Sequence, residues 1–258
     1  VFAALATGGA VVSGQYIGKK RPEQSCKAGE QLVLFVSTIS IVIMTVIYCF
    51  KHGILHGLFG NIDKVVMNDA NEYLLIVCAS IPFIAIYNSG AALFRAQGNS
   101  KVSMKVSLLM NGINVAGNAI LIFVFHMGVA GVAWPTLISR IVAAVVIICL
   151  LNKQTLTIHI SKEFWKSFLH PVKERIFQWH LIKKICQVGI PNGVENGMFQ
   201  LGKLILLSLI SSFGTSSITA NAVSNTIAGI AILPGQTLGL AMITVISQCV
   251  GAGDKIQT

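Results

Sequence analysis

The sequence predicts an all-α integral membrane protein, a polytopic helical bundle with about seven transmembrane helices. Two observations lead to this fold class. Of the 258 residues, 54% are hydrophobic and only 11% are charged, whereas charged residues make up about 25% of a typical soluble domain. In addition, five long runs contain no Lys, Arg, Asp or Glu, and a helix crosses the bilayer with roughly 20 apolar residues.

The uncharged runs locate the individual helices. They cover residues 1–18, 31–50, 73–94, 106–139 and 204–253. Turn-forming residues around Gly128 and Gly214 divide the last two runs into two helices each. The predicted spans are therefore 1–18, 31–50, 72–94, 104–125, 130–151, 185–213 and 217–250. Because the first span opens without a charged leader, and a basic loop follows the last, we expect a fragment of a longer protein.

The basic residues predict how the chain crosses the membrane. Fifteen of the 19 Lys and Arg residues lie in every second connection, and only two lie in the other connections. The positive-inside rule places the basic connections 19–30, 95–105 and 152–184 in the cytoplasm. The net charge of +10 is thus explained by topology in the cell membrane, and we expect no nucleic-acid partner.

The connection 152–184 is the longest and most polar. It contains an apolar stripe flanked by basic residues, which predicts an amphipathic helix in the membrane interface: Phe164, Phe168, Val172 and Ile176. We interpret the connection as a linker between two lobes.

A weak internal repeat supports two lobes. Gln15 and Gly18 end the first span in the order Gln, any residue, aliphatic, Gly, and Gln248 and Gly251 end the last span in the same order, 233 positions later. The last span is the sixth after the first, so the two copies run in the same direction, as in transporters built from two parallel halves. We therefore assign residues 1–151 to helices two to six of an N-lobe whose helix one is missing, 152–184 to the cytoplasmic linker, and 185–258 to helices seven and eight of a C-lobe.

Polar residues within the spans are the candidate functional residues. An ionisable group at membrane depth is costly unless it meets a partner or water. Three such groups occur, Glu195, Arg140 and Lys203. Glu195 shares one helix face with other polar side chains: Asn192, Asn196, Gln200 and Lys203. A second stripe combines Asn111, Asn114 and Asn118. Each stripe either lines a cavity, where Glu195 attracts a cation or exchanges a proton, or joins helices.

The roles of Arg140 and of two prolines are open. Arg140 either faces the cavity and pairs with a carboxylate or packs against carbonyl groups. Pro82 and Pro234 interrupt their predicted helices and are candidate hinges. The sequence contains no phosphate-binding loop and no nucleophile with a matching base, so we expect neither an ATP-driven pump nor an enzyme. We expect no cofactor and no resident metal ion.

Short motifs in the predicted order resemble the multidrug and toxic compound extrusion (MATE) family, in its Gram-positive bacterial form. They are Ser-Gly-Gln-Tyr-Ile-Gly at 13–18, Phe-Arg-Ala-Gln-Gly-Asn-Ser-Lys at 94–101, Gly-Val-Ala-Gly-Val-Ala at 128–133, Gly-Ile-Pro-Asn-Gly-Val-Glu-Asn at 189–196 and Gln-Cys-Val-Gly-Ala-Gly-Asp at 248–254. The chain departs from the family pattern at two positions. Some members carry the acid of helix seven where this chain has Phe199, and many carry Asp where it has Asn118.

The resemblance implies a twelve-helix, two-lobe secondary active exporter. Such a protein exchanges bulky, often cationic, organic compounds for Na⁺ or H⁺ by alternating access. We expect a monomer whose partners are small-molecule substrates and the lipid bilayer. The alternatives are a lipid-linked oligosaccharide flippase of the same superfamily, or a membrane scaffold that transports nothing.

Overall fold

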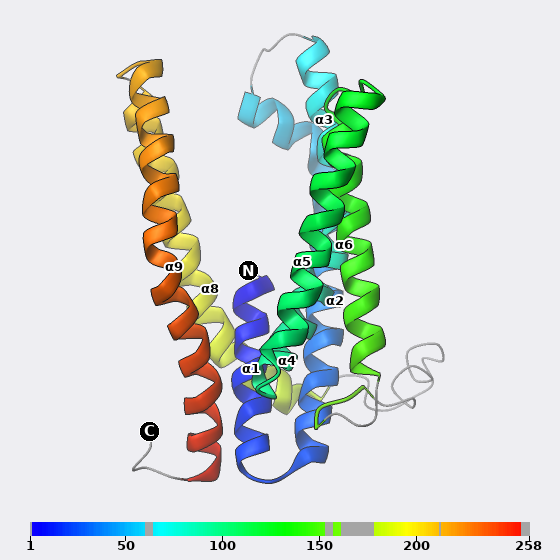
Figure 1. The fold of residues 1–258 in the computed structure, drawn as a ribbon, viewed down its shortest axis with the longest axis vertical. Helices are drawn as coiled ribbons and strands as arrows, with labels where there is room; N and C mark the ends of the chain where they lie inside the picture. Colours follow the sequence, from blue (N-terminus) through cyan, green and yellow to red (C-terminus); the bar gives the residue numbers. More distant parts are fainter. Residues whose placement is uncertain (1, 60–63, 153–156, 161–177, 212, 254–258) are drawn as a thin grey trace.

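The computed structural model describes residues 2–59, 64–152, 157–160, 178–211 and 213–253. Within these ranges all regular secondary structure is helical (Figure 1). The helices are α1 Phe2–Gly18, α2 Pro22–Phe59, α3 Lys64–Ala79, α4 Ile81–Ala96, α5 Ser100–Ala119, a short π-helix η1 Ile120–Val124, α6 Ala130–Leu151, α8 Trp179–Ser211 and α9 Thr215–Ala252. The stripe at 164–176 that predicts an interfacial helix lies outside the described residues.

The helices match the seven predicted spans. The span 130–151 coincides with α6, and the others shift by a few residues or continue into the connections. Five helical segments of the described chain are long and apolar enough to cross a membrane. The other two predicted spans correspond to α1, which has 17 residues, and α8, whose polar stripe dilutes its apolar character.

The span predicted at 72–94 is interrupted at Ser80, which separates α3 from α4. Pro82 then lies in the first turn of α4, where its missing N–H removes no helical hydrogen bond. Pro234 differs, because α9 continues through it without a break. The predicted interruption at Pro234 is therefore wrong, and the hinge role of both prolines stays a prediction.

Small residues on α1 allow it to pack between two groups of helices. On one side it contacts α2 and α4, whose buried side chains include Leu32 and Phe94. On the other side it packs as extensively against α8 and α9. A side chain at Gly8 would overlap the backbone of Gly189 on α8, so glycine is required for this close approach. The division into lobes 1–151 and 185–258 stays a prediction.

The two ends of the molecule differ. The helices α1, α4 and α6 end towards the lower end of Figure 1, where α9 also ends. From that end the α8–α9 pair leans away from α5 and α6 towards the upper end (Figure 1). We call the lower end, which carries Lys19, Lys20, Arg21, Lys101 and Lys105, the basic end.

Candidate functional site

An amide cluster joins α5 to α6 at the position of the second predicted stripe. The Asn114 side-chain amide donates to the Thr136 hydroxyl at 3.1 Å, and the Asn118 amide donates to Asn114 Oδ1 at 3.1 Å. Asn118 Oδ1 is buried and has no hydrogen-bond partner among the described residues. A buried carbonyl oxygen without a donor is unfavourable by about 1–3 kcal/mol. The cluster therefore retains one unused acceptor for a donor or a cation.

Arg140 on α6 is bound to the break between α3 and α4. Its guanidinium donates to the Ser80 hydroxyl at 2.6 Å, and that hydroxyl donates to the Val77 carbonyl. Ser80 is fully buried. The sequence left two roles open for Arg140, pairing with a carboxylate and packing against carbonyl groups. The structure shows a third role, in which Arg140 binds Ser80 at the point where the neighbouring span is interrupted.

The contact between Arg140 and Ser80 is expected to stabilise the fold measurably. A hydrogen bond to a charged group contributes about 1.5–3 kcal/mol. We expect Arg140→Met and Ser80→Ala each to lower the free energy of unfolding in mixed micelles. The double variant should lose about 1 kcal/mol less than the sum of the two. Strict additivity would contradict a direct interaction.

The predicted polar stripe on α8 lies on one helix face, and most of its side chains are exposed. The Asn196 amide donates to Asn192 Oδ1 at 2.8 Å, and Gln200 is exposed. The Lys203 ammonium lies 4.8 Å from the centre of the Phe199 ring. Glu195 is exposed and has no hydrogen bond or ion pair with a described residue. From the sequence, a buried acid is expected here. Among the described residues Glu195 is instead accessible, because α8 beyond Gly189 has little described structure beside it.

The structure does not bring the two stripes into contact. Neither α5 nor α6 packs against α8 within the described residues. If Glu195 and Asn118 act on a common ligand, that ligand must span the space between the helix groups.

The four residues of the Gln-x-aliphatic-Gly repeat meet each other at the basic end. A Cβ at Gly18 would overlap the Gln248 carbonyl oxygen, and a Cβ at Gly251 would overlap the Gln15 carbonyl oxygen. The contact is therefore reciprocal, which is the signature of two elements related by a two-fold axis. Both helices run towards the basic end, as the repeat predicts (Figure 1).

Two further contacts complete this crossing, which we call the α1–α9 junction. Gly14 faces the Ser247 side chain, and these residues are also 233 positions apart, so the axis passes between them. Ser247 is only 4% exposed. The Gln248 amide donates to the Ala96 carbonyl at 2.8 Å and thereby ties α9 to the end of α4. The junction therefore closes the basic end between the two helix groups.

Three hydroxyl residues were not predicted from the sequence, although each makes one of the contacts described above: Ser80, Thr136 and Ser247. Hydroxyl side chains are common within spans and carry little signal on their own. For Ser247 a signal existed, since it occupies the repeat position of Gly14. For Ser80 the signal was its position two residues before Pro82, where a helix starts.

Comparisons with known proteins agree with this architecture. The MatE family model matches residues 1–120 and 191–257. An uncharacterized transporter of Bacillus subtilis, YisQ, is 26% identical over 97% of this chain and 53% of its own length. A probable multidrug resistance protein of Thermotoga maritima, NorM, is 25% identical over 86% of this chain and 46% of its own length. The chain thus spans about half the length of the relatives it matches.

Two solved structures show the same fold. One is the outward-facing conformation of a multidrug resistance MATE family transporter, with a TM-score of 0.84 and 18% identity over 97% of this chain and 53% of that one. The other is a Vibrio cholerae MATE transporter in a bent form, with a TM-score of 0.82 and 19% identity over 100% of this chain and 56% of that one. The chain therefore belongs to the MATE family and is a multi-pass membrane protein.

Proposed function

We propose that the complete protein is a secondary active multidrug exporter, which exchanges bulky organic compounds, often cationic, for Na⁺ or H⁺. The observation that carries this proposal is the α1–α9 junction. Alternating access requires a contact that closes one side while the other side is open. The junction has this geometry, because helices that touch at the basic end diverge towards the opposite end (Figure 1).

The proposed topology places the basic end in the cytoplasm, according to the positive-inside rule. The conformation described here is then the one closed to the cytoplasm. One similar solved structure is outward-facing, which supports this interpretation. In the opposite state the junction must separate, so that substrate enters from the cytoplasm or the inner leaflet. We further propose that the protein works as a monomer in the cell membrane.

Glycine at the junction is expected to be necessary for transport. In Gly18→Ala and Gly251→Ala, the added methyl group meets a backbone carbonyl of the partner helix. Overpacking of this kind is unfavourable by about 1–3 kcal/mol, and 1.4 kcal/mol corresponds to about a tenfold change in an equilibrium. We expect each variant to reduce the initial rate of efflux about tenfold, measured with a fluorescent organic cation in proteoliposomes.

The double variant and a control test whether the two glycines belong to one contact. Because Gly18 and Gly251 disturb the same crossing, the double variant should be little worse than either single variant. Gly112→Ala on α5 is the matched control, since a Cβ there has no described atom within 4 Å. A full defect in only one of the two single variants would contradict the reciprocal junction.

The coupling ion is proposed to act at Glu195 and at the amide cluster of Asn114 and Asn118. Amides coordinate Na⁺ but release no proton, so a proton must be carried by a carboxylate such as Glu195. Imposing Na⁺ and pH gradients separately on proteoliposomes identifies the ion. Efflux that responds to neither gradient would overturn the exporter proposal.

The flippase alternative receives no support from the cationic residues within the spans. Arg140 is bound to Ser80, and Lys203 lies over Phe199. The two cations lie on different helices, α6 and α8, which do not pack against each other within the described residues, so together they do not form one phosphate-binding group.

A further inference from the structure

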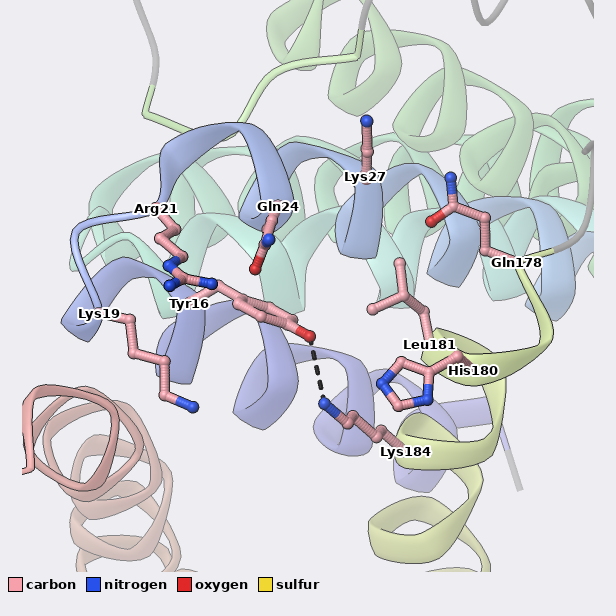
Figure 2. Close-up of a pocket in the computed structure, with 9 residues that line it drawn as sticks. All are labelled: Tyr16, Lys19, Arg21, Gln24, Lys27, Gln178, His180, Leu181 and Lys184. Carbon is pink, nitrogen blue, oxygen red and sulfur yellow. Dashed lines mark hydrogen bonds between the residues drawn. The ribbon is translucent and has the colours of Figure 1, made fainter.

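A basic pocket lies at the basic end, beside the α1–α9 junction. It is a hollow of about 450 Å³ between the end of α1, the start of α2 and the start of α8. Nine described residues line it: Tyr16, Lys19, Arg21, Gln24, Lys27, Gln178, His180, Leu181 and Lys184. Figure 2 shows the side chains of Lys19, Arg21 and Lys184 around Tyr16. The pocket is not part of the amide cluster or of the α8 stripe.

The charge of this pocket is of one sign. Four Lys and Arg residues and one His are among the described lining residues, and none of these lining residues is acidic. The two acids of the same part of α2, Glu23 and Glu30, do not line the hollow. A cleft lined by one sign of charge concentrates counter-ions. Lys and Arg side chains beside a hydroxyl donor are the groups that bind phosphate oxygens.

One lysine of the pocket, Lys184, is held in place by contacts with Tyr16. The Lys184 ammonium donates to the Tyr16 hydroxyl at 3.3 Å and lies 5.6 Å from the centre of its ring. Lys184 belongs to α8 and Tyr16 to α1, so this contact joins the two helix groups. An ammonium has three donors, and two of those on Lys184 are left for a bound anion.

The level at which the pocket lies relative to the membrane indicates the source of an anion that binds there. α1 ends at Gly18, and the uncharged part of α2 begins at residue 31, so the pocket lies where the apolar parts of both helices end. Tyr16 has the interfacial position typical of membrane proteins. This is the level of lipid phosphates, and basic pockets between helices on the cytoplasmic side bind anionic headgroups.

We propose that the basic pocket binds a phosphate-bearing anion, and that an anionic phospholipid headgroup is its source. The anion contacts residues from α1, α2 and α8 together. A ligand shifts a conformational equilibrium towards the state that it binds more tightly. The bound lipid therefore favours the closed α1–α9 junction. The binding itself is independent of the transport proposal, whereas the effect on the junction rests on it.

Lipid retention by the complete protein tests the binding without any transport assay. The protein is delipidated in neutral detergent, titrated with phosphatidylglycerol or phosphatidylcholine, and examined by native mass spectrometry. We expect wild-type protein to retain phosphatidylglycerol in preference. The Lys19→Gln/Lys184→Gln variant should bind it at least about tenfold more weakly, since each basic residue near anionic lipid contributes about a few-fold in affinity.

A matched variant and a competition arm decide the outcome. Lys101→Gln/Lys105→Gln removes the same charge from exposed positions at the same end of the molecule, and should bind like wild type. A second pocket variant, Arg21→Gln/Lys27→Gln, covers the case in which the first does not fold. Displacement of the lipid by inorganic phosphate at equal concentration would keep the phosphate site but assign it to a soluble ligand. Equal retention of phosphatidylglycerol by the pocket variants and the control would overturn the proposal.

Discussion

Oxidation of a Gly14→Cys/Ser247→Cys variant of the complete protein is expected to abolish transport, and a reductant is expected to restore it. A Cβ at Gly14 lies 3.1 Å from Ser247 Cβ. Disulfides join Cβ atoms about 3.5–4.5 Å apart, so a small adjustment of the two helices allows the bond. The bond would hold the α1–α9 junction closed. If alternating access requires this junction to open, the oxidised protein cannot complete its cycle.

The design has internal controls. All native cysteines of the complete protein, which include the six of this chain and among them Cys249 close to the junction, must first be replaced so that only one pair can form. The single variants Gly14→Cys and Ser247→Cys carry the same local change without a crosslink. We expect their efflux of a fluorescent cation to be insensitive to oxidant. Continued transport by a fully crosslinked double variant would show that the junction is not a gate.

The sequence predicts the helices well because membrane crossing imposes a strong physical pattern. A span needs a long, predominantly apolar run, and the span predicted at 130–151 coincides with α6. The helix ends beyond the membrane are less predictable, as α2 shows by continuing to Phe59. Outside the hydrocarbon, water competes for the backbone groups, so local propensity and packing set the end of a helix.

The junction could be anticipated only in part. The repeat of Gln15 and Gly18 at Gln248 and Gly251 indicates equivalent helices, but it does not say that they touch. Contact depends on where the two-fold axis passes, which is a property of the assembled helices. The same holds for Arg140, because its partner Ser80 lies 60 residues away and becomes visible only in the structure.

Substitution of Glu195 tests whether the polar stripe on α8 takes part in ion coupling. Glu195→Gln is expected to abolish efflux driven by a Na⁺ or H⁺ gradient while leaving the protein level unchanged. The side chain lies on the face of α8 that carries Asn192, Asn196 and Gln200. Glutamine has nearly the same shape as glutamate, so the replacement removes a charge with little change in packing. An amide of the same shape neither carries a proton nor balances a cation.

A control substitution at a second carboxylate shows whether the effect of Glu195→Gln is specific to that residue or follows from the loss of any negative charge. Glu72 on α3 is also exposed but lies far along the chain from both polar stripes, and Glu72→Gln makes the same chemical change. We expect this control to transport at the wild-type rate. If Glu195→Gln also transports normally under both gradients, the coupling acid must lie elsewhere in the complete protein. Glu195 would then be a polar contact of α8, and the exporter proposal would still stand on the junction.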